Sequence, residues 1–307
     1  MQRRDFLVRA SLATLAVWTE TQAASCIGST AEQVTSGLNL SGKTAVVTGC
    51  NSGIGLETMR VLALRGAHVI GTARTLEKGQ QACAQIKGRT TPVVLELSDF
   101  ASVVACADAI RKLNVRIDML ILNAGITISE WHAINGIEQH FLVNHLGHFL
   151  LTQRLLDRVT TAEQGRVVVV GSGNHRDAPK GGIQFDDLSG KSWKNYYAHS
   201  KLANGLFSLE LSKRLRGTSA TSNCLTPGAV DTNIRRHLSK DDWPDQLKPV
   251  AEGAATVCYV ATQPSLAKVT GEYFKDCGPA PQHAYQTDAA MAKRLWEVST
   301  ELTRKYL

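Results

Sequence analysis

Tyr197 and Lys201 are four residues apart in a segment, 196–215, whose apolar residues recur with helical spacing. Side chains at this separation project from the same face of a helix. An ammonium beside a phenol favours the phenolate, which brings the phenol pKa from about 10 toward neutrality and makes the group a usable proton donor and acceptor. The pair alone is a weak signal, because Tyr and Lys at this spacing also cover ordinary helix surfaces.

A glycine-rich turn near the start of the chain is a second candidate site. It directly follows the β-branched run 44–48 and precedes a helical segment, 56–64. Gly49 would allow a tight turn, and the absent side chains of Gly53 and Gly55 would let a pyrophosphate approach backbone N–H groups at the positive start of the helix. An ordinary strand-to-helix turn is the alternative, but the order of strand, glycines and helix favours a dinucleotide site.

The end of the second predicted strand indicates which dinucleotide would bind. About twenty residues past such a turn, an acidic residue would bind the ribose of NAD, whereas an arginine would accommodate the 2′-phosphate of NADP. Arg74 stands at this place, and no acidic residue lies between Gly66 and Glu77. The sequence therefore predicts NADP(H), with a solvated surface charge as the other interpretation of Arg74.

Short β-branched runs alternating with helical segments must position these groups. They read as strands buried on both faces, which is typical of a parallel sheet joined by right-handed helical crossovers. No linker rich in Pro, Gly or Ser divides the chain, so we expect one α/β domain over about 41–307, preceded by a lead-in over 26–40. The predicted strands are 44–48, 68–72, 92–97, 119–122, 166–170 and 222–225.

Taken in this order, the motifs resemble the short-chain dehydrogenase/reductase family, and within it the retinol dehydrogenases and the WW-domain-containing oxidoreductases. The resemblance covers about residues 41–307, although the WW modules are missing. It implies a single Rossmann-type, doubly wound α/β domain with a mainly parallel sheet of about seven strands. The segments that carry it are Thr48-Gly49, Asn51-Ser52-Gly53-Ile54-Gly55, Asn123-Ala124-Gly125, Val143-Asn144-His145-Leu146-Gly147-His148-Phe149, Ser172, Tyr197, Ser200-Lys201-Leu202-Ala203-Asn204, Pro227-Gly228, Gly271-Glu272-Tyr273-Phe274 and Leu295-Trp296-Glu297.

The resemblance also implies a role for each site residue. Tyr197 would be the general acid/base that protonates a carbonyl oxygen during reduction, while Lys201 would lower its pKa and hold the nicotinamide ribose. Ser172 would hydrogen-bond the substrate oxygen, and Asn144 would position a water that links Lys201 to solvent. The remaining implied cofactor contacts are the turn residues Gly49, Asn51, Ser52, Gly53, Ile54 and Gly55, then Asn123, Ala124 and Gly125 beside the adenosine, and Pro227, Gly228, Val230 and Thr232 over the nicotinamide.

Two positions depart from the family pattern. Gly171 precedes Ser172 where a serine is common, and adds backbone freedom there. Glu96 replaces the usual Asp of the third strand, so we assign it no adenine contact. A serine hydrolase is disfavoured, because Gly171-Ser172-Gly173 lacks the G-x-S-x-G turn.

The composition indicates a folded protein and argues against nucleic-acid or metal binding. The net charge of +7 comes from scattered basic residues, and only 6% of residues are aromatic, which leaves no basic patch with a stacking platform. The seven cysteines show neither a C-x-x-C pair nor zinc spacing, and their odd number favours reduced thiols packed in the interior. We interpret His132, His140, His145, His148, His175 and His199 as packing or polar surface.

The first 25 residues have the layout of a signal peptide. Arg3 and Arg4, followed by Phe6-Leu7, an apolar stretch to Trp18 and small residues at Ala23-Ala24, resemble a twin-arginine signal. The stretch is too short and too polar for a permanent membrane span. We expect export, for example to a periplasm, with a cytoplasmic enzyme that has an irregular N-terminus as the alternative.

These observations predict an enzyme that interconverts an alcohol and a carbonyl with NADP(H). The competing hypothesis is a cofactor-binding sensor or scaffold that holds NADP(H) without turnover. The loops 175–195 and 233–250 would contact the substrate, and Trp193, Leu238 and Trp243 in them hint at a lipophilic compound such as a retinoid or steroid. The family often forms dimers or tetramers through the helices that would carry Asn144 and Tyr197.

Overall fold

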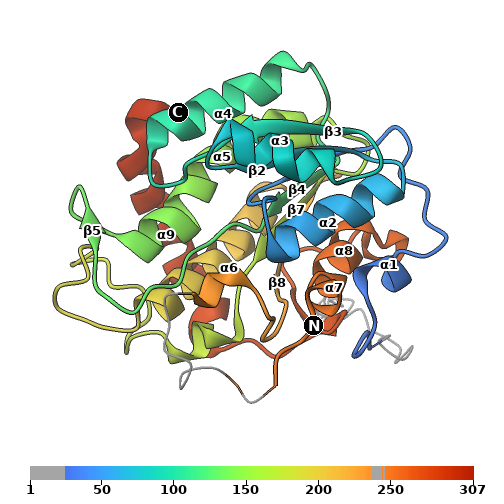
Figure 1. Cartoon of the computed structure of the whole chain (residues 1–307). Coiled ribbons are helices and arrows are strands. Elements are labelled where there is room, and N and C mark those ends of the chain that lie inside the picture. The colour runs from blue at the N-terminus through green and yellow to red at the C-terminus, as the bar shows by residue number, and fades with distance from the viewer. Residues whose placement is uncertain (1–24, 237–243, 245) are drawn as a thin grey trace, which may run out of the picture.

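The computed structural model of the chain describes residues 25–236, 244 and 246–307 (Figure 1). The predicted signal segment, apart from residue 25, lies outside these residues, as do Leu238 and Trp243. A single eight-stranded sheet has the order β10-β9-β8-β7-β4-β1-β2-β3. Its strands are β1 (Thr44–Val47), β2 (His68–Ala73), β3 (Thr90–Val94), β4 (Met119–Leu122), β7 (Arg166–Val170), β8 (Thr221–Thr226), β9 (Tyr273–Lys275) and β10 (Gly278–Pro279).

The prediction of a mainly parallel α/β sheet is confirmed. All neighbouring strands from β3 to β9 pair in parallel, and only β9 and β10 are antiparallel. The sheet has one strand more than the seven or so expected, and β9 and β10 were not among the strands assigned from the sequence. β9 and β10 are both shorter than any of the runs from which the other strands were predicted.

Helices cover both faces of the sheet (Figure 1). Successive residues of a strand point to opposite faces, so a strand buried on both sides serves two apolar layers. In β1, Val46 belongs to the same buried cluster as Phe149 and Leu211, whereas Val47 belongs to the cluster of Met59. The helices are α1 (Ala31–Val34), α2 (Gly53–Leu64), α3 (Leu76–Ala84), α4 (Phe100–Lys112), α5 (Gly147–Thr160), α6 (Tyr196–Arg214), α7 (Val250–Gly253), α8 (Ala255–Thr262) and α9 (Ala289–Thr303).

Short elements complete the fold. A two-stranded hairpin of β5 (Ala133–Ile134) and β6 (Ile137–Glu138) precedes a π-helical turn, η1 (Phe141–Leu146), which continues directly into α5. The 3₁₀ turn η2 (Gly173–Asp177) follows β7, and η3 (Asn233–Arg235) follows β8. The other 3₁₀ turns among the described residues are η5 (Pro264–Leu266), η6 (Ala284–Thr287) and η7 (Arg304–Tyr306).

The third strand begins and ends earlier than the run 92–97 indicated. β3 spans Thr90–Val94 and lies at the edge of the sheet, with β2 as its partner. The β2–β3 pairing begins with Val69 opposite Thr90 and ends with Ala73 opposite Val94. One further hydrogen bond follows, from the Leu95 N–H to the Ala73 carbonyl. The pairing is therefore set by the length of β2, and the apolar residues beyond Val94 belong to the loop that enters the site.

The expectation that the cysteines are reduced is wrong for two of the seven. Cys26 and Cys277 form a disulfide across a sequence separation of 251 residues. A pairing over such a distance leaves no signature in cysteine spacing, which is the signal that the prediction used. The other cysteines are free, and all but Cys83 are buried: Cys50, Cys106, Cys224 and Cys258.

No helix within the described ranges is long and apolar enough to cross a membrane.

Candidate active site

A cavity of about 1080 Å³ lies along the carboxyl ends of the central strands. In doubly wound sheets this edge holds the ligand, at the point where the strand order reverses, here between β1 and β4. Of the residues assigned to the site from the sequence, only Asn144 does not line the cavity. Those that do are Gly49, Asn51, Ser52, Gly53, Ile54, Gly55, Arg74, Asn123, Ala124, Gly125, Ser172, Tyr197, Lys201, Pro227, Gly228, Val230 and Thr232.

The glycines of the first turn are required by the protein's own packing. Gly49 has φ +73°, and a Cβ there would lie 3.0 Å from the Cβ of Ala124. A Cβ at Gly55 would lie 2.1 Å from the carbonyl oxygen of Gly49, a distance that no rearrangement of a side chain could relieve. We expected the bare position at Gly55 to admit a phosphate, but its first function is to let α2 pack closely on β1.

The start of α2 faces the cavity without a side-chain cap. Ser52 is the N-cap residue, in extended conformation, and its hydroxyl makes no capping hydrogen bond. The first N–H groups of a helix have no partner within the helix, and they carry the positive end of its dipole. Because Ser52 and Gly53 both line the cavity, this helix start is suited to an anionic group.

Thr48 joins the two strands beside the glycine turn, and sequence reasoning gave it no such function. Its hydroxyl accepts hydrogen bonds from the backbone N–H groups of Asn123 and Ala124, each at 2.9 Å. The Asn123 side chain donates in return to the Thr48 carbonyl oxygen at 2.9 Å. On the other side, Thr48 Oγ1 lies 2.9 Å from Nε2 of buried His148. These contacts fix the loop after β4 against the end of β1.

Arg74 and Glu96 border the adenosine end expected for the cavity. Arg74 follows β2, is exposed, and has no ion-pair partner among the residues that the structure describes. The Glu96 carboxylate also borders the cavity but accepts hydrogen bonds from the Ser98 backbone N–H at 3.0 Å and hydroxyl at 2.7 Å. Arg74 is thus available to a phosphate, whereas Glu96 is engaged in its own loop.

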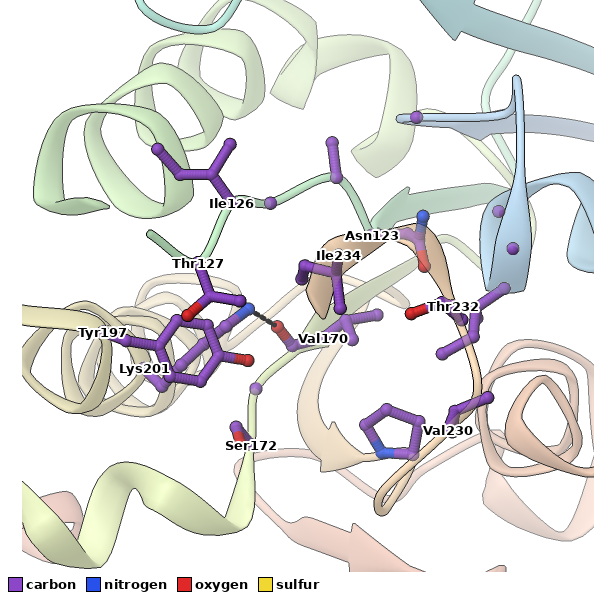
Figure 2. Close-up of a pocket in the computed structure, with 18 of the residues that line it drawn as sticks. Asn123, Ile126, Thr127, Val170, Ser172, Tyr197, Lys201, Val230, Thr232 and Ile234 are labelled. Carbon is purple, nitrogen blue, oxygen red and sulfur yellow. Dashed lines mark hydrogen bonds between the residues drawn. The ribbon is translucent and has the colours of Figure 1, made fainter. Parts of the chain in front are cut away.

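Tyr197 and Lys201 lie in the first turns of α6, on the face toward the cavity (Figure 2). The Lys201 ammonium lies 5.6 Å from the centroid of the Tyr197 ring and donates to the Val170 carbonyl oxygen at 3.0 Å. Burial lowers the pKa of Lys201 to about 8. The predicted pair is therefore brought together, and the ammonium is anchored to the end of β7.

Ser172 follows β7 and lines the same cavity as Tyr197 (Figure 2). Its hydroxyl donates to Oδ1 of Asn174 at 3.0 Å and accepts from the Asn174 backbone N–H at 3.2 Å. A Cβ at Gly171 would lie 2.8 Å from Sγ of Cys224. The departure from the family pattern thus has a packing reason, because Cys224 fills the space that a side chain at residue 171 would need.

Asn144 lies behind the cavity, in the π-helical turn that precedes α5. Its side-chain oxygen accepts from the Ile126 N–H at 2.8 Å, and its amide donates to the Ile126 carbonyl at 3.1 Å and to the Ser200 hydroxyl at 2.9 Å. The Ser200 hydroxyl donates onward to the Tyr197 carbonyl at 2.7 Å. Asn144 therefore connects the loop after β4 to the helix turn that carries Tyr197, and π-helical turns often mark functional sites.

The segment after β8 closes the cavity beside the glycine turn, across from Tyr197 and Lys201. Gly228 has φ +84°, and Val230 is buried. A Cβ at Gly53 would lie 3.2 Å from Cγ2 of Thr232, so the segment approaches the start of α2 closely. Figure 2 shows Val230 and Thr232 on this far wall, facing the side that holds Lys201 and Tyr197.

The histidines are mostly interior residues. Within the described ranges no group of His, Cys, Asp and Glu side chains is arranged to hold a metal ion. Burial lowers the pKa values of His145 and His199 to about 3 and that of His148 to about 4, so these imidazoles are neutral. His132 differs, since 57% of its side chain is exposed.

Trp193 packs away from the described cavity. Its ring centroid lies 4.3 Å from that of His199 and 5.2 Å from that of Tyr196, and its Nε1 donates to the Asp187 carbonyl at 2.6 Å. Further polar residues that line the cavity were not assigned individually from the sequence. They include Asn174, Arg176, Asn195 and Lys275.

Sequence relatives match this chain over most of their length. The chain is 40% identical over 281 residues to retinol dehydrogenase 12 of Homo sapiens, which covers 86% of this chain and 87% of that protein. It is 38% identical over 300 residues to short-chain dehydrogenase TIC 32 B, chloroplastic, of Brassica napus, with 89% and 92% covered. It is 37% identical over 303 residues to the WW domain-containing oxidoreductase of Gallus gallus, with 91% and 72% covered.

Solved structures of similar fold point to the same family as these relatives. A putative uncharacterized protein from Mycobacterium paratuberculosis superposes with a TM-score of 0.73 at 33% identity, over 88% of this chain and 97% of that one. A short chain dehydrogenase from Burkholderia cenocepacia in complex with NADP gives a TM-score of 0.63 at 25% identity, over 76% and 96%. The sequence profile of the short chain dehydrogenase family matches residues 43–243. The chain therefore belongs to the short-chain dehydrogenase/reductase family of oxidoreductases.

Proposed function

We propose that this chain is an NADP(H)-dependent oxidoreductase that interconverts an alcohol and a carbonyl compound. The observation that carries the proposal is a single cavity with two differently equipped ends. One end presents an uncapped helix start and Arg74, and the other presents Ser172, Tyr197 and Lys201. A bound dinucleotide would thus have its phosphates at the first end and its reactive ring beside a proton donor at the second.

The residues present fit a nicotinamide dinucleotide. The Ser52 side chain does not cap the first N–H groups of α2, and Ser52 and Gly53 line a cavity of about 1080 Å³. Arg74 stands where the 2′-phosphate of NADP would lie, so it supports NADP over NAD. The segment with Gly228, Val230 and Thr232 would cover the nicotinamide, and Lys201 would donate to its ribose. When bound, this cofactor supplies or accepts the hydride.

The protein's own residues supply orientation and proton transfer. The hydroxyls of Ser172 and Tyr197 would hydrogen-bond the carbonyl oxygen, and Tyr197 would protonate it as the C–H bond forms. The Lys201 ammonium stabilises the phenolate that remains. The hydrogen bonds from Asn144 through Ser200 to the Tyr197 carbonyl hold the helix turn that presents the phenol. Asn144 would also position the water that returns a proton to Lys201.

A sensor or scaffold that binds NADP(H) without turnover is the competing function. Loss or displacement of a catalytic side chain would favour it. In this chain Ser172, Tyr197 and Lys201 are all present and line one cavity. That convergence supports an enzyme.

The names of the retinol dehydrogenase relatives support a lipophilic substrate. Trp193 gives this idea less support than we expected, since its ring packs against His199 and Tyr196. The cavity is also lined by Arg176 and Lys275, neither with an ion-pair partner in the described ranges. Carbonyl compounds with a carboxylate therefore belong in the same test as retinoids and steroids.

A screen of carbonyl compounds with the purified full chain tests the proposal. Loss of reduced-nicotinamide absorbance would be followed with NADPH and with NADH, using retinal, a steroid ketone, and aromatic aldehydes with and without a carboxylate. Turnover of at least one compound, faster with NADPH, is expected. Binding of NADPH with no turnover in either direction would instead support the sensor: no carbonyl would be reduced with NADPH, and no matching alcohol would be oxidised with NADP⁺.

The disulfide supports the proposal that the protein is exported. Cys26 immediately follows the predicted signal segment, and it is paired with Cys277. Disulfides persist in oxidising compartments such as the periplasm, whereas cytoplasmic thiols are usually kept reduced. Twin-arginine transport carries folded proteins, so the enzyme could fold around its cofactor before crossing. Uncleaved full-length protein confined to the cytoplasm, with Cys26 reduced, would refute export.

Helix α9 opposes the expected dimer or tetramer contact through the helices that carry Asn144 and Tyr197. Helix α9 packs on both: Trp296 stacks with Phe207 of α6 at 5.9 Å and contacts Phe149 of α5 at 5.0 Å. A homodimer through the Trp296 side of α5 and α6 would have to displace α9. Light scattering of the purified chain decides between a monomer and the dimer or tetramer.

A further inference from the structure

The wall proposed to cover the nicotinamide is held from behind by Lys248. The Lys248 N–H donates to the Ala229 carbonyl at 2.8 Å, and the Lys248 carbonyl accepts from the Asp231 N–H at 3.0 Å. Together these bonds form a parallel bridge between Lys248 and Val230. The wall backbone at Ala229 and Asp231 is thus paired with the backbone of Lys248.

The side chain of Lys248 supports the same wall. A Cβ at Gly228 would lie 3.3 Å from Cε and 3.4 Å from Nζ of Lys248, so the lysine stem lies directly beneath Gly228. The side chain of Val230 packs against Gly253 of α7, because a Cβ at Gly253 would lie 2.5 Å from Cγ1 of Val230. The position of the wall therefore depends on the stem remaining in place.

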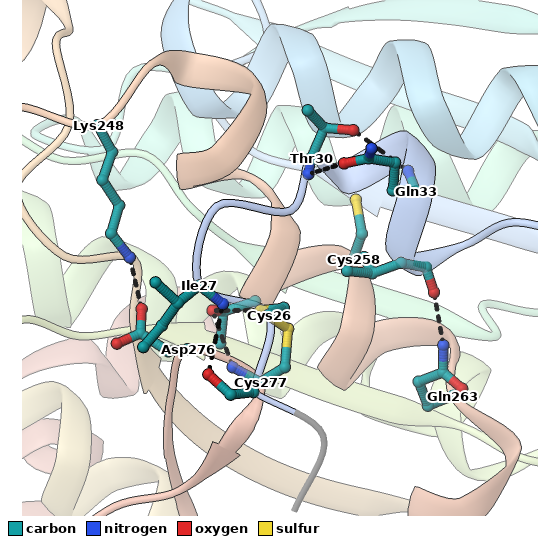
Figure 3. Close-up of a disulfide and its surroundings, with 12 residues drawn as sticks. Cys26, Ile27, Thr30, Gln33, Lys248, Cys258, Gln263, Asp276 and Cys277 are labelled. Atoms are coloured by element: carbon teal, nitrogen blue, oxygen red, sulfur yellow. Dashed lines mark hydrogen bonds and ion pairs between the residues drawn. A yellow bond between two sulfur atoms is a disulfide. The ribbon is translucent and has the colours of Figure 1, made fainter.

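The stem is held by an ion pair at its far end. The Lys248 ammonium pairs with the Asp276 carboxylate, and only 29% and 20% of the two side chains are exposed (Figure 3). A partly buried ammonium without this carboxylate would turn toward water to regain its hydration. Such a turn would withdraw the stem from beneath Gly228.

Asp276 is in turn fixed by the disulfide. It lies in the tight turn between β9 and β10, where Asp276 and Cys277 have φ +49° and +62°. The Cys26 N–H donates to the Asp276 carbonyl at 3.0 Å, and Cys277 donates to the Thr256 hydroxyl at 3.3 Å. Figure 3 shows the disulfide and the ion pair side by side on this turn. The start of the described chain thus anchors the carboxylate that holds Lys248.

We propose that Lys248 is a positioning residue for the nicotinamide half of the cofactor, and that Asp276 and the Cys26–Cys277 disulfide fix it in place. The proposal rests on the proposed function, because it assigns the wall over 228–232 to the nicotinamide. Lys248 need not touch the cofactor. It acts by holding the backbone that does.

Cofactor binding to the full-length oxidised chain tests the proposal, with the fluorescence of bound NADPH as readout. Asp276→Asn removes the carboxylate while keeping a residue that tolerates positive φ. We expect the Kd for NADPH to rise about tenfold, which corresponds to about 1.4 kcal/mol. Adding Lys248→Met to this variant removes the stranded charge but keeps an apolar stem, and should recover most of the lost affinity.

Two controls separate positioning from general damage. Adenosine 2′,5′-bisphosphate contains the adenosine half of NADP alone, so its Kd should be the same in wild type and Asp276→Asn. A variant that is simply misfolded would lose both ligands. Cys26→Ser breaks the disulfide without altering the backbone at Cys277, and should weaken NADPH binding in the same selective way, whereas Cys83→Ser, at a free cysteine on α3, should not.

The outcomes distinguish this proposal from the function on which it rests. Failure of the wild-type chain to bind NADPH would contradict the proposed function itself. Normal NADPH binding by wild type, together with unchanged affinity in Asp276→Asn or an equal loss of the bisphosphate, would overturn only the role of Lys248. Selective loss of NADPH in Asp276→Asn, with unchanged affinity in Cys26→Ser, would overturn the role given to the disulfide.

Discussion

The ammonium of Lys201 lies 5.6 Å from the ring centroid of Tyr197, one helical turn away on α6, and is anchored to the Val170 carbonyl at 3.0 Å. The contact with Val170 places the charge at the carboxyl end of β7, beside the strand edge where the cavity opens. The pair is therefore more than a surface feature of a helix. Its charge is largely hidden from water, and this has a consequence for the dependence on pH.

Cofactor affinity should fall as the pH rises through about 8. Burial lowers the pKa of Lys201 to about 8, so the ammonium that would hold the nicotinamide ribose loses its proton above that pH. We expect the Kd for NADPH, measured by fluorescence, to increase from about pH 7 to about pH 9.5. In Lys201→Arg, whose guanidinium remains charged, this pH dependence should disappear. The same pH dependence in both proteins would show that another group titrates.

Stability should change in the opposite direction over the alkaline range. An unfolded lysine titrates near pH 10.4, so between about pH 8 and about pH 10.4 the unfolded chain binds more protons at this residue than the folded chain. The contribution of Lys201 to the free energy of unfolding therefore rises with pH across that window. Comparison of denaturant midpoints for wild type and Lys201→Met would reveal it as a difference that grows more favourable to wild type with increasing pH.

Arg74 should set the choice between the two cofactors. Arg74→Ser removes a charged partner of the 2′-phosphate, and we expect the Kd for NADPH to rise at least about tenfold, since hydrogen bonds to charged groups contribute about 1.5–3 kcal/mol. The Kd for NADH should change little. Lys78→Ser is a suitable control, because Lys78 is exposed on α3 and does not line the cavity. An unchanged NADPH-to-NADH ratio in Arg74→Ser would assign the phosphate to another residue.

Gly171 should tolerate a side chain only if its neighbour becomes smaller. The Cβ of Gly171→Ala would lie 2.8 Å from Sγ of Cys224, and overpacking of this kind costs about 1–3 kcal/mol. We expect a lower midpoint of thermal unfolding for Gly171→Ala and partial recovery in Gly171→Ala/Cys224→Ala. If the effects of the two substitutions on the unfolding midpoint simply add, the Cys224 sulfur is not the reason that residue 171 is a glycine.

The disulfide should contribute substantially to stability outside reducing conditions. It closes a loop over a sequence separation of 251 residues, and a native disulfide typically contributes about 2–4 kcal/mol. Cys26→Ser should unfold at lower denaturant concentration than wild type, and wild type kept under a dithiol reductant should move toward the same midpoint. Equal midpoints for all three would mean that the bond adds nothing, and would weaken the case for an oxidising compartment.

The strands and the glycine turn could be predicted because local sequence determines them. Val46 and Val47 serve opposite apolar layers, so β1 reads as a continuous β-branched run. Tyr197 and Lys201 lie on one helix, where spacing alone fixes their common face. These signals are contained within a few residues of each other.

Contacts between distant segments could not be predicted in this way. The Thr48 hydroxyl meets Asn123, Cys224 fills the space beside Gly171, and Cys26 reaches Cys277, all across long stretches of chain. No local pattern marks such partners. For the same reason Gly55 was assigned to a phosphate, although the carbonyl of Gly49 already excludes a side chain there.

The rate of hydride transfer in the Tyr197→Phe variant tests the proposed mechanism most directly. The variant keeps the ring in its place on α6 and removes only the hydroxyl that would transfer the proton. With a carbonyl compound reduced by wild type, the rate of NADPH oxidation in a single turnover should fall by at least about 100-fold, the usual contribution of a general acid. The Kd for NADPH should stay within about twofold of wild type. A variant that still reduces the compound at the wild-type rate would contradict the assignment of Tyr197 and, with it, the proposed mechanism.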